Sequence, residues 1–301
     1  MADILVIGSL NADLVVRTRR FPEPGETIQG EDLAIIPGGK GANQAVAAAR
    51  QGADVDMVGR VGDDSFGPLL LQNLGENHVG TTRVQQDSGA TGTAIIVVES
   101  AGQNSIVLSP GANGKVASSD VDALDFEVVK VLLLQFEIPL ETVHYAARLA
   151  HAHGTRVLLN PAPAQPIPDT LMANVDILIP NESELAALSG MPVSDRATAL
   201  AAAKSLLDKG PPVVIVTLGA DGALLVDRER ATHLPGYPVE VVDTTAAGDA
   251  FIGGLAAALL RGMPLDQAVR YGNAAGALAT TRFGAQPSLP TIAEVEKFLR
   301  R

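Results

Sequence analysis

The segment at residues 243–249 reads Asp-Thr-Thr-Ala-Ala-Gly-Asp and combines a run of small residues with an acidic residue at its end. Because a helix-like apolar pattern starts directly after it, we expect Asp249 in the first turn of a helix. Backbone N–H groups there have no partners within the helix, and together with the helix dipole they bind anions. The small side chains of Ala246, Ala247 and Gly248 let a phosphate approach this backbone. A carboxylate beside an anion hole can accept the proton of an attacking hydroxyl group, so the segment predicts phosphoryl transfer to an alcohol.

The segment at residues 38–43, Gly-Gly-Lys-Gly-Ala-Asn, is the second dense motif. It is not a P-loop, since Gly41 stands where a Ser or Thr follows the lysine in that motif. A tight turn that enters a helix would explain the glycines alone. Lys40 and Asn43, however, are three residues apart and share one face of the first helical turn, so both can also point toward a small polyol.

Asn11 and Asp13 follow the first expected strand. Both residue types favour turns, where their side chains bond to the nearby backbone. If the chain stays extended instead, their spacing of two places both side chains on one face. Together with Lys40 and Asn43 they would then form a ring of groups that bind sugar hydroxyls.

Two further polar segments follow expected strands. Residues 181–184, Asn-Glu-Ser-Glu, fit an ordinary helix start with Asn181 as N-cap, or a site at which Glu184 orders water around magnesium and phosphate. Residues 217–222, Thr-Leu-Gly-Ala-Asp-Gly, fit a hairpin with 223–226 as its return strand, or a loop on which a nucleotide lies. The sequence leaves these alternatives open.

The composition narrows the class of protein. The chain has 301 residues, of which 47% are hydrophobic and 3% aromatic, so we expect one domain over residues 1–301 with a large aliphatic core. The formal net charge is −12 and no basic stripe occurs, which argues against nucleic acid as a partner. There is no cysteine, no signal-peptide pattern and no apolar run of membrane-spanning length, so we expect a soluble cytoplasmic protein.

Short apolar runs alternate with helical patterns along most of the chain. Six runs are expected to be strands, at residues 4–7, 55–58, 131–134, 157–159, 177–179 and 213–216. Helical patterns lie between several of them, at residues 43–50, 69–74, 140–151 and 197–207. This order predicts an α/β fold with a doubly wound, mostly parallel sheet flanked by helices, and ligands at the carboxyl ends of the strands.

Two regions, at about residues 13–36 and 93–108, break this alternation because they contain no helix. Each has two short strand patterns around a turn, at 14–16 with 27–28 and at 93–98 with 105–108 across 99–104. We expect two hairpins. These strands can extend the edge of the main sheet or form a small β-sheet lid over the site, and the sequence favours neither strongly.

Taken together, these motifs resemble the ribokinase-like family of carbohydrate kinases. The resemblance runs through nearly the whole chain, at residues 8–13, 38–49, 62–64, 160–164, 180–182, 243–249 and 284–288. The Gly-Gly pair and the Asp-Thr-x-Ala-Ala-Gly-Asp segment are the strong family markers. The Asn-x-Asp start at residues 11–13 and the Gly-Ala-Gln-Pro-Ser stretch at 284–288 point more narrowly to members that phosphorylate ribose at its 5-hydroxyl. The resemblance implies a fold with a small four-stranded lid.

The resemblance also implies roles for individual residues. Asp249 would be the base for the ribose 5-hydroxyl, and the backbone of residues 246–249 would form the anion hole. The sugar would be held by Asn11, Asp13, Gly39, Lys40, Asn43 and Glu137. ATP would lie along Asn181, Thr217, Gly219, Gly222 and Asn273, and Glu184 would act near magnesium and phosphate.

Three partners besides ribose follow from the same resemblance. ATP would enter with Mg²⁺. A potassium ion would activate the enzyme from a site beside the anion hole, at Asp243, Thr245, Ala279, Arg282, Gly284 and Ser288. A second copy of the chain would bind through the lid sheet to form a homodimer.

Two other functions stay open. Another kinase of the same family would act on deoxyribose, a hexose or adenosine, although the low aromatic content offers little surface on which a nucleobase stacks. A sugar-binding regulator would keep the fold without turnover, and the intact Asp249 with its small neighbours argues against that reading.

Overall fold

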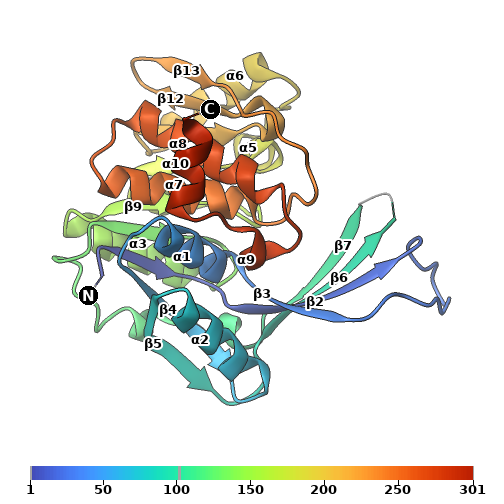
Figure 1. Ribbon diagram of the computed structural model, residues 1–301. Coiled ribbons are helices and arrows are strands. Elements are labelled where there is room, and N and C mark those ends of the chain that lie inside the picture. Colours follow the sequence, from blue (N-terminus) through green and yellow to red (C-terminus); the bar gives the residue numbers. More distant parts are fainter. Residues whose placement is uncertain (1, 101–102, 301) are drawn as a thin grey trace.

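The computed structural model describes residues 2–100 and 103–300. Its largest element is a nine-stranded sheet in the order β13-β12-β11-β10-β9-β8-β1-β4-β5 (Figure 1). Neighbours from β11 to β5 are parallel, whereas β12 and β13 are antiparallel. The strands are β1 (Ile4–Ile7), β4 (Val55–Gly62), β5 (Val79–Asp87), β8 (Val131–Leu134), β9 (Arg156–Leu159), β10 (Ile177–Leu178), β11 (Val213–Thr217), β12 (Ala223–Asp227) and β13 (Ala231–Leu234). The predicted, mostly parallel sheet is confirmed.

Helices cover both faces of this sheet because its strands are apolar on both faces. Ile4 and Val6 point into one core, and the alternate residues Leu5 and Ile7 point into the other. The first core is closed by α1 (Lys40–Arg50), α2 (Phe66–Glu76), α7 (Ala247–Leu260), α8 (Leu265–Ala279) and α10 (Ile292–Leu299). The second is closed by α3 (Leu140–Ala152), α4 (Asp169–Met172), α5 (Glu182–Ser189) and α6 (Arg196–Leu207). No helix in the described residues is long and apolar enough to span a membrane.

A second, smaller sheet projects from the main body (Figure 1). Its order is β3-β2-β6-β7, from β2 (Asn11–Thr18), β3 (Ala34–Gly38), β6 (Gly92–Glu99) and β7 (Asn104–Ser109). β2 lies in the middle, antiparallel to β3 and parallel to β6. These strands pair with one another rather than with the main sheet, so they form a separate sheet and not an extension of its edge.

The prediction of a strand at Thr27 and Ile28 is wrong. Both residues lie in the segment 19–33, which contains no strand, and the partner of β2 begins at Ala34. Two β-branched residues are too few to hold a strand against the prolines and glycines around them. Ile35 instead pairs with Leu14. The predicted turn at 99–104 includes residues 101–102, which lie outside the described residues.

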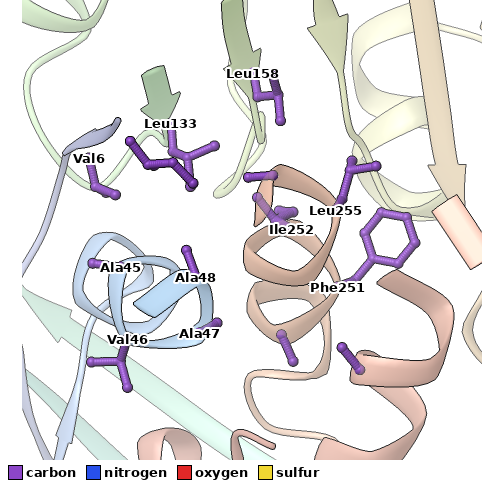
Figure 2. Packing of buried hydrophobic residues seen from close by; sticks show 14 of the residues in the cluster. Val6, Ala45, Val46, Ala47, Ala48, Leu133, Leu158, Phe251, Ile252 and Leu255 are labelled. Carbon is purple, nitrogen blue, oxygen red and sulfur yellow. The ribbon is translucent and has the colours of Figure 1, made fainter. Parts of the chain in front are cut away.

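Small residues allow α1 and α7 to pack directly on one another. Figure 2 shows Ala47 and Ala48 on the side of α1 that faces α7. A Cβ atom added to Gly253 of α7 would lie 2.4 Å from the Cβ of Ala47 and 2.7 Å from the backbone N of Ala48. The two helices can approach this closely only because residue 253 has no side chain. Since the 38–43 motif opens α1 and the 243–249 motif opens α7, the crossing joins the two motifs.

Candidate active site

Asp249 lies in the first turn of α7, and only 6% of the residue is exposed. Its Oδ2 accepts a hydrogen bond from Asn43 Nδ2 at 2.9 Å, and its Oδ1 accepts one from Gln44 Nε2 at 3.0 Å. Both donors lie near the start of α1. The structure therefore brings together two motifs that the sequence could describe only separately.

The N-terminus of α7 is open to an anion. No side chain caps the helix, and the backbone amides of Gly248 and Asp249 have no backbone partner among the described residues. Ala246 has φ of 58°, a left-handed conformation that is rare outside glycine and is often found at functional sites. A Cβ atom on Gly248 would meet nothing within 4 Å. Free N–H groups facing an empty space can bind a phosphate.

Burial raises the pKa of the Asp249 carboxyl. The nearby Lys40 ammonium and the amides of Asn43 and Gln44 oppose this effect because they stabilise the ionised form. Burial likewise disfavours the charged form of Lys40, yet Asp249, Glu137 and Glu184 together hold its pKa above the usual value. The site thus contains a carboxylate with increased proton affinity next to a permanent positive charge, an arrangement that suits a general base.

Glu137 connects the ends of three elements. Its Oε2 accepts hydrogen bonds from Ser9 Oγ at 2.6 Å, from the backbone N of Lys40 at 3.1 Å and from Asn11 Nδ2 at 3.4 Å. Asn11 is the first residue of β2, and Asp13 lies two positions along the same strand. The extended alternative is therefore correct for these two residues, and their side chains share one face.

Asp13 is a second buried acid of this cluster. Burial, together with the negative charges of Glu137 and Asp249, raises the pKa of Asp13 to about 7. The glycines before α1 leave room for the cluster. A Cβ atom on Gly38 would lie 2.2 Å from Asp13 Oδ2, and one on Gly39, where φ is 86°, would lie 2.7 Å from the backbone N of residue 11. The Gly-Gly pair thus makes a tight turn and also gives the polar side chains their space.

A cleft of about 200 Å³ lies over the N-terminus of α7. It is lined by Lys40, Asn160, Ile179, Asn181, Glu184, Thr217, Thr244, Ala246, Gly248, Asp249 and Ile252. A larger hollow of about 1230 Å³ lies between the small sheet and the segments 241–245 and 283–285, and it shares Thr244 with the cleft. We take the smaller cleft as the candidate reaction site because it is lined by Asp249 and by the open N-terminus of α7.

Asn181 and Glu184 form a capping box at the start of α5. Asn181 Oδ1 accepts a hydrogen bond from the backbone N of Glu184 at 2.8 Å, and Glu184 Oε2 accepts one from the backbone N of Asn181 at 2.9 Å. The helix-start interpretation is therefore right for the local structure. Both residues also line the cleft, and burial raises the pKa of Glu184 against the effects of the Asn181 N–H group and Lys40.

Of the other residues expected along ATP, Thr217 lines the cleft, whereas Gly219, Gly222 and Asn273 do not. Thr217 ends β11 and lines the cleft. Gly219 has φ of 54° and open space around it, whereas a Cβ atom on Gly222 would lie 2.2 Å from the backbone O of Leu234. Asn273 Nδ2 donates to the same Leu234 oxygen at 2.9 Å and does not line the cleft. The predicted hairpin is confirmed, since β11 and β12 are antiparallel around these glycines.

The residues expected around a monovalent cation lie where two segments meet. Asp243 Oδ1 accepts from the backbone N of Thr245 at 2.9 Å, and Asp243 Oδ2 accepts from the backbone N of Gly284 at 2.9 Å. The second segment also carries Ala279, Arg282 and Ser288. Among the described residues, no group of three or more His, Cys, Asp or Glu could hold a metal ion. The donors here are carboxylate, hydroxyl and carbonyl oxygens, the type that hard cations prefer.

Sequence reasoning gave no site role to four buried amide side chains. Gln44, which binds Asp249, also donates to Asn160 Oδ1 and accepts from Gln135 Nε2. Asn113 Nδ2 donates to Asn11 Oδ1 at 2.7 Å. Gln44 stands inside the 38–49 stretch and Asn160 directly follows a strand, so both gave a positional signal. Gln135 and Asn113 are single polar residues without a motif, and only the fold identifies their partners.

Comparisons with known proteins agree with this geometry. The family model described as pfkB family carbohydrate kinase matches residues 1–292. A ribokinase of Haemophilus influenzae is 42% identical over 299 residues, covering 98% of each chain. A deoxyribokinase of Salmonella typhi is 40% identical over 301 residues, covering 99% of this chain and 98% of its own. The structure of Arabidopsis thaliana ribokinase complexed with ribose and ATP superposes with a TM-score of 0.92 at 34% identity, covering 100% of this chain and 99% of its own. A match along nearly the whole chain, at up to 42% identity to these curated relatives, establishes that this chain belongs to the pfkB family of carbohydrate kinases.

Proposed function

We propose that this protein transfers the γ-phosphoryl group of ATP to the 5-hydroxyl of D-ribose, giving D-ribose 5-phosphate and ADP. One observation carries the proposal: the buried Asp249 carboxylate lies beside the unpaired N–H groups of the first turn of α7. The relatives support the choice of substrate, since the Haemophilus influenzae protein is a ribokinase and the Arabidopsis thaliana structure holds ribose and ATP.

Asp249 accepts the proton of the ribose 5-hydroxyl. At the same time the 5-oxygen of the sugar attacks the γ-phosphorus in line with the leaving oxygen of ADP. The new O–P bond forms as the bond between the γ-phosphorus and the bridging oxygen breaks. The backbone N–H groups around Ala246, Ala247 and Gly248 stabilise the negative charge on the phosphoryl group during transfer. Because the hydroxyl and the phosphate are held side by side, most of the rate enhancement comes from position and electrostatics.

The sugar pocket is built around Glu137, Asn11 and Asp13. Carboxylate oxygens accept hydrogen bonds from sugar hydroxyls, and the Asn11 Nδ2 donates one. Lys40, Asn43 and the Gly39 backbone complete the ring from the start of α1, where the backbone N of Lys40 donates to Glu137 and Asn43 donates to Asp249. We infer that these groups hold the hydroxyls and direct the 5-hydroxyl toward Asp249.

ATP lies along the carboxyl ends of β10 and β11, with Asn181, Thr217, Gly219 and Gly222 on its path and Asn273 bracing the Leu234 backbone behind the hairpin. Mg²⁺ bound to the phosphates neutralises part of their charge. We infer that Glu184 acts near this Mg²⁺, because Glu184 lines the cleft together with Lys40 and Asp249. The Lys40 ammonium favours the ionised form of the Glu184 carboxyl.

A potassium ion fits the junction of the segments around Asp243 and Gly284. The Asp243 carboxylate already ties the two segments together through hydrogen bonds from Thr245 and Gly284. The 245–249 stretch connects this junction to the anion hole, so a cation bound here would add positive charge beside the N-terminus of α7 and would hold the preceding loop in place. Ala279, Arg282 and Ser288 would contribute oxygens from the second segment.

We propose that the small sheet is a lid within one 1–301 domain and that its outer face binds a second copy of the chain. Leu14 pairs in register with Ile35 and Ile95, and Ile95 pairs with Val107, so the four side chains form one row. Ile35, Ile95 and Val107 are exposed by 47%, 51% and 63%. An isolated apolar row of this kind on a four-stranded sheet fits a homodimer interface.

A cytoplasmic location stays a prediction.

Deoxyribose is the main alternative acceptor, because the Salmonella typhi relative is a deoxyribokinase at nearly the same identity. The two sugars differ only in the 2-hydroxyl. If a buried polar group of the pocket binds that hydroxyl, deoxyribose leaves the group unpaired, and kcat/KM for deoxyribose falls by a large factor relative to ribose. A pocket that ignores the 2-hydroxyl would accept both sugars almost equally.

The test is ADP formation from ATP and Mg²⁺ with D-ribose, 2-deoxyribose, fructose and adenosine as separate acceptors. The proposal predicts the highest kcat/KM for D-ribose. A higher value for 2-deoxyribose would reassign the substrate and leave the phosphoryl-transfer chemistry in place. Binding of ribose without ADP formation would indicate a sugar-binding regulator instead.

A further inference from the structure

Two buried glutamines form a chain of hydrogen bonds that ends on Asp249. Gln135 Nε2 donates to Gln44 Oε1 at 2.6 Å, and Gln44 Nε2 donates to Asp249 Oδ1 at 3.0 Å. Neither glutamine has any exposed surface. We refer to Gln135, Gln44 and Asp249 as the amide relay. Of its three members only Asp249 lines the cleft.

The Asp249 carboxylate determines how the two glutamine amides are oriented. An ionised carboxylate only accepts hydrogen bonds, so Gln44 must turn its NH₂ group to Asp249 and its carbonyl oxygen away. That oxygen then needs a donor, and Gln135 provides one. Reversing either amide would place two acceptors face to face. With a donor from Gln44 on Oδ1 and one from Asn43 on Oδ2, the amides stabilise the ionised form of Asp249 more than the protonated form.

The fold keeps the two glutamines in this orientation. Gln44 Nε2 also lies 3.3 Å from Asn160 Oδ1, and Asn160 Nδ2 donates to the backbone O of Ile179 at 3.1 Å. Gln135 follows β8 directly, and its Oε1 occupies the space that a side chain on Gly8 would need, 2.1 Å from a Cβ atom placed there. The Gln135 Oε1 atom has no hydrogen-bond partner in the described residues. Within the described residues, the Gln135 side chain makes a hydrogen bond to Gln44 alone.

We propose that Gln44 and Gln135 are positioning residues that hold Asp249 ionised and correctly oriented for proton abstraction. The proposal rests on the role given to Asp249 above and adds residues that do not touch a substrate. Asn43 binds the other carboxylate oxygen, so the two amides together fix the plane of the carboxylate. Charge-assisted hydrogen bonds of this kind favour the ionised state over the neutral one.

Other charges face Asp249 and act on the same equilibrium. Lys40 of α1 favours its ionised form, whereas Glu137 after β8 disfavours it. The charge of Asp249 also couples to Glu184 of α5 and to Asp13 of β2. None of these charged groups changes when a glutamine is replaced by methionine. A shift in such a variant therefore reports the amide relay.

The experiment compares the pH dependence of kcat/KM for D-ribose in the wild type, Gln44→Met and Gln135→Met. Methionine has nearly the volume of glutamine but donates no hydrogen bond. We expect the acid limb to move to higher pH by roughly one unit in Gln44→Met, the value of a hydrogen bond to a charged group, and by less in Gln135→Met. We also expect kcat to fall while KM for ribose stays within about twofold.

Gln51→Met is the matched control. Gln51 is also buried and just follows α1, but it binds Tyr271 and the backbone O of Pro290 and does not touch Asp249. Its acid limb should coincide with that of the wild type. If Gln44→Met and Gln135→Met lose activity with an acid limb as unchanged as that of Gln51→Met, the two glutamines act only in packing and the proposal is overturned.

A second measurement separates this proposal from the proposed function. Selective ¹³C labelling of aspartate carboxyls, with Asp249 assigned by its loss in Asp249→Asn, follows the titration of Asp249 without any turnover. A higher midpoint in Gln44→Met than in the wild type supports the relay even if D-ribose proves to be the wrong acceptor. Equal midpoints overturn the relay even if the wild type is an active kinase.

Discussion

Asn113 Nδ2 donates a hydrogen bond to Asn11 Oδ1 over 2.7 Å, although the two residues are 102 positions apart in the chain. Asn113 is almost completely buried, and its side chain also binds the backbone N and O of Leu10. Because Oδ1 of Asn11 is occupied in this way, Nδ2 of Asn11 must face Glu137 and the sugar pocket. A residue outside the pocket therefore decides which atom of Asn11 meets the sugar.

Replacing Asn113 should weaken sugar binding more than turnover. In Asn113→Asp the new carboxylate cannot donate to Asn11 Oδ1, so the Asn11 amide is free to turn and present the wrong atom. We expect KM for D-ribose to rise about tenfold, the cost of roughly one misdirected hydrogen bond, with a smaller change in kcat. Steady-state kinetics with ribose as the varied substrate measures both values. An unchanged KM would mean that Asn113 does not control Asn11.

Gly253→Ala should destabilise the protein despite the better helix propensity of alanine. The added Cβ atom would come within 2.4 Å of Ala47 Cβ and 2.7 Å of a backbone atom of α1, so the two helices must separate. Such overpacking costs about 1–3 kcal/mol. Thermal unfolding followed by circular dichroism measures the change. Because the crossing also places Gln44 against Asp249, we expect kcat to fall as well.

Gly75→Ala is the control for that prediction. Gly75 lies in α2, and a Cβ atom there would meet nothing within 4 Å. The substitution should be neutral or stabilising by up to about 1 kcal/mol, since alanine is the better helix former. If both alanine variants have the same Tm as the wild type, α1 and α7 do not pack closely at Gly253.

Asp13→Asn should raise stability at pH 8 while it impairs sugar binding. The folded-state pKa of Asp13 is about 7, well above the usual 3.8. The unfolded chain therefore loses the Asp13 proton at lower pH than the folded protein, and the contribution of this group to stability falls as pH rises from about 4 to 7. Asparagine carries no such cost. Each kcal/mol regained corresponds to a rise in Tm of about 2–4 °C.

Melting curves of the wild type and Asp13→Asn across pH 4 to 8 provide the test. The advantage of the variant in Tm should be largest at pH 8 and should shrink toward pH 4, close to the usual pKa of 3.8, below which Asp13 is protonated in both states. An advantage that is independent of pH would have another origin. A loss of stability at pH 8 would contradict the raised pKa of Asp13.

Potassium should stimulate turnover through the Asp243 junction. Replacing K⁺ with tetramethylammonium at constant ionic strength should lower kcat, because a bulky organic cation cannot enter a site made of closely spaced oxygens. Asp243→Ala should lose this difference between the two salts, since the carboxylate binds both segments of the junction. Equal activity of the wild type in both salts would remove potassium from the mechanism.

Much of the fold was predictable because its signals are local. Apolar runs too short for helices, separated by helical patterns, identify the parallel sheet, and a small-residue run before Asp249 identifies the start of α7. The strand at Thr27 and Ile28 was wrong because pairing in the small sheet depends on partners such as Leu14 and not on the local pattern alone.

The site was predictable where a motif contains the functional residue and not where the residue is a single buried amide. The Asn11 and Asp13 spacing and the Lys40 and Asn43 spacing each carry information within a few residues. Gln135 acquires its meaning only from Gln44, 91 positions away, because the end of β8 and the start of α1 meet in space. No spacing rule in the sequence connects them.

The most direct test is the rate of ADP formation from ATP and D-ribose, with Mg²⁺ and K⁺, by the wild type and by Asp249→Asn. Asparagine keeps the size of the side chain and removes the base. The wild type should turn over D-ribose, and the variant should have a kcat lower by about 10²–10⁴-fold, the usual cost of a lost general base. Near-normal turnover by Asp249→Asn would contradict the role of Asp249 and with it the proposed mechanism.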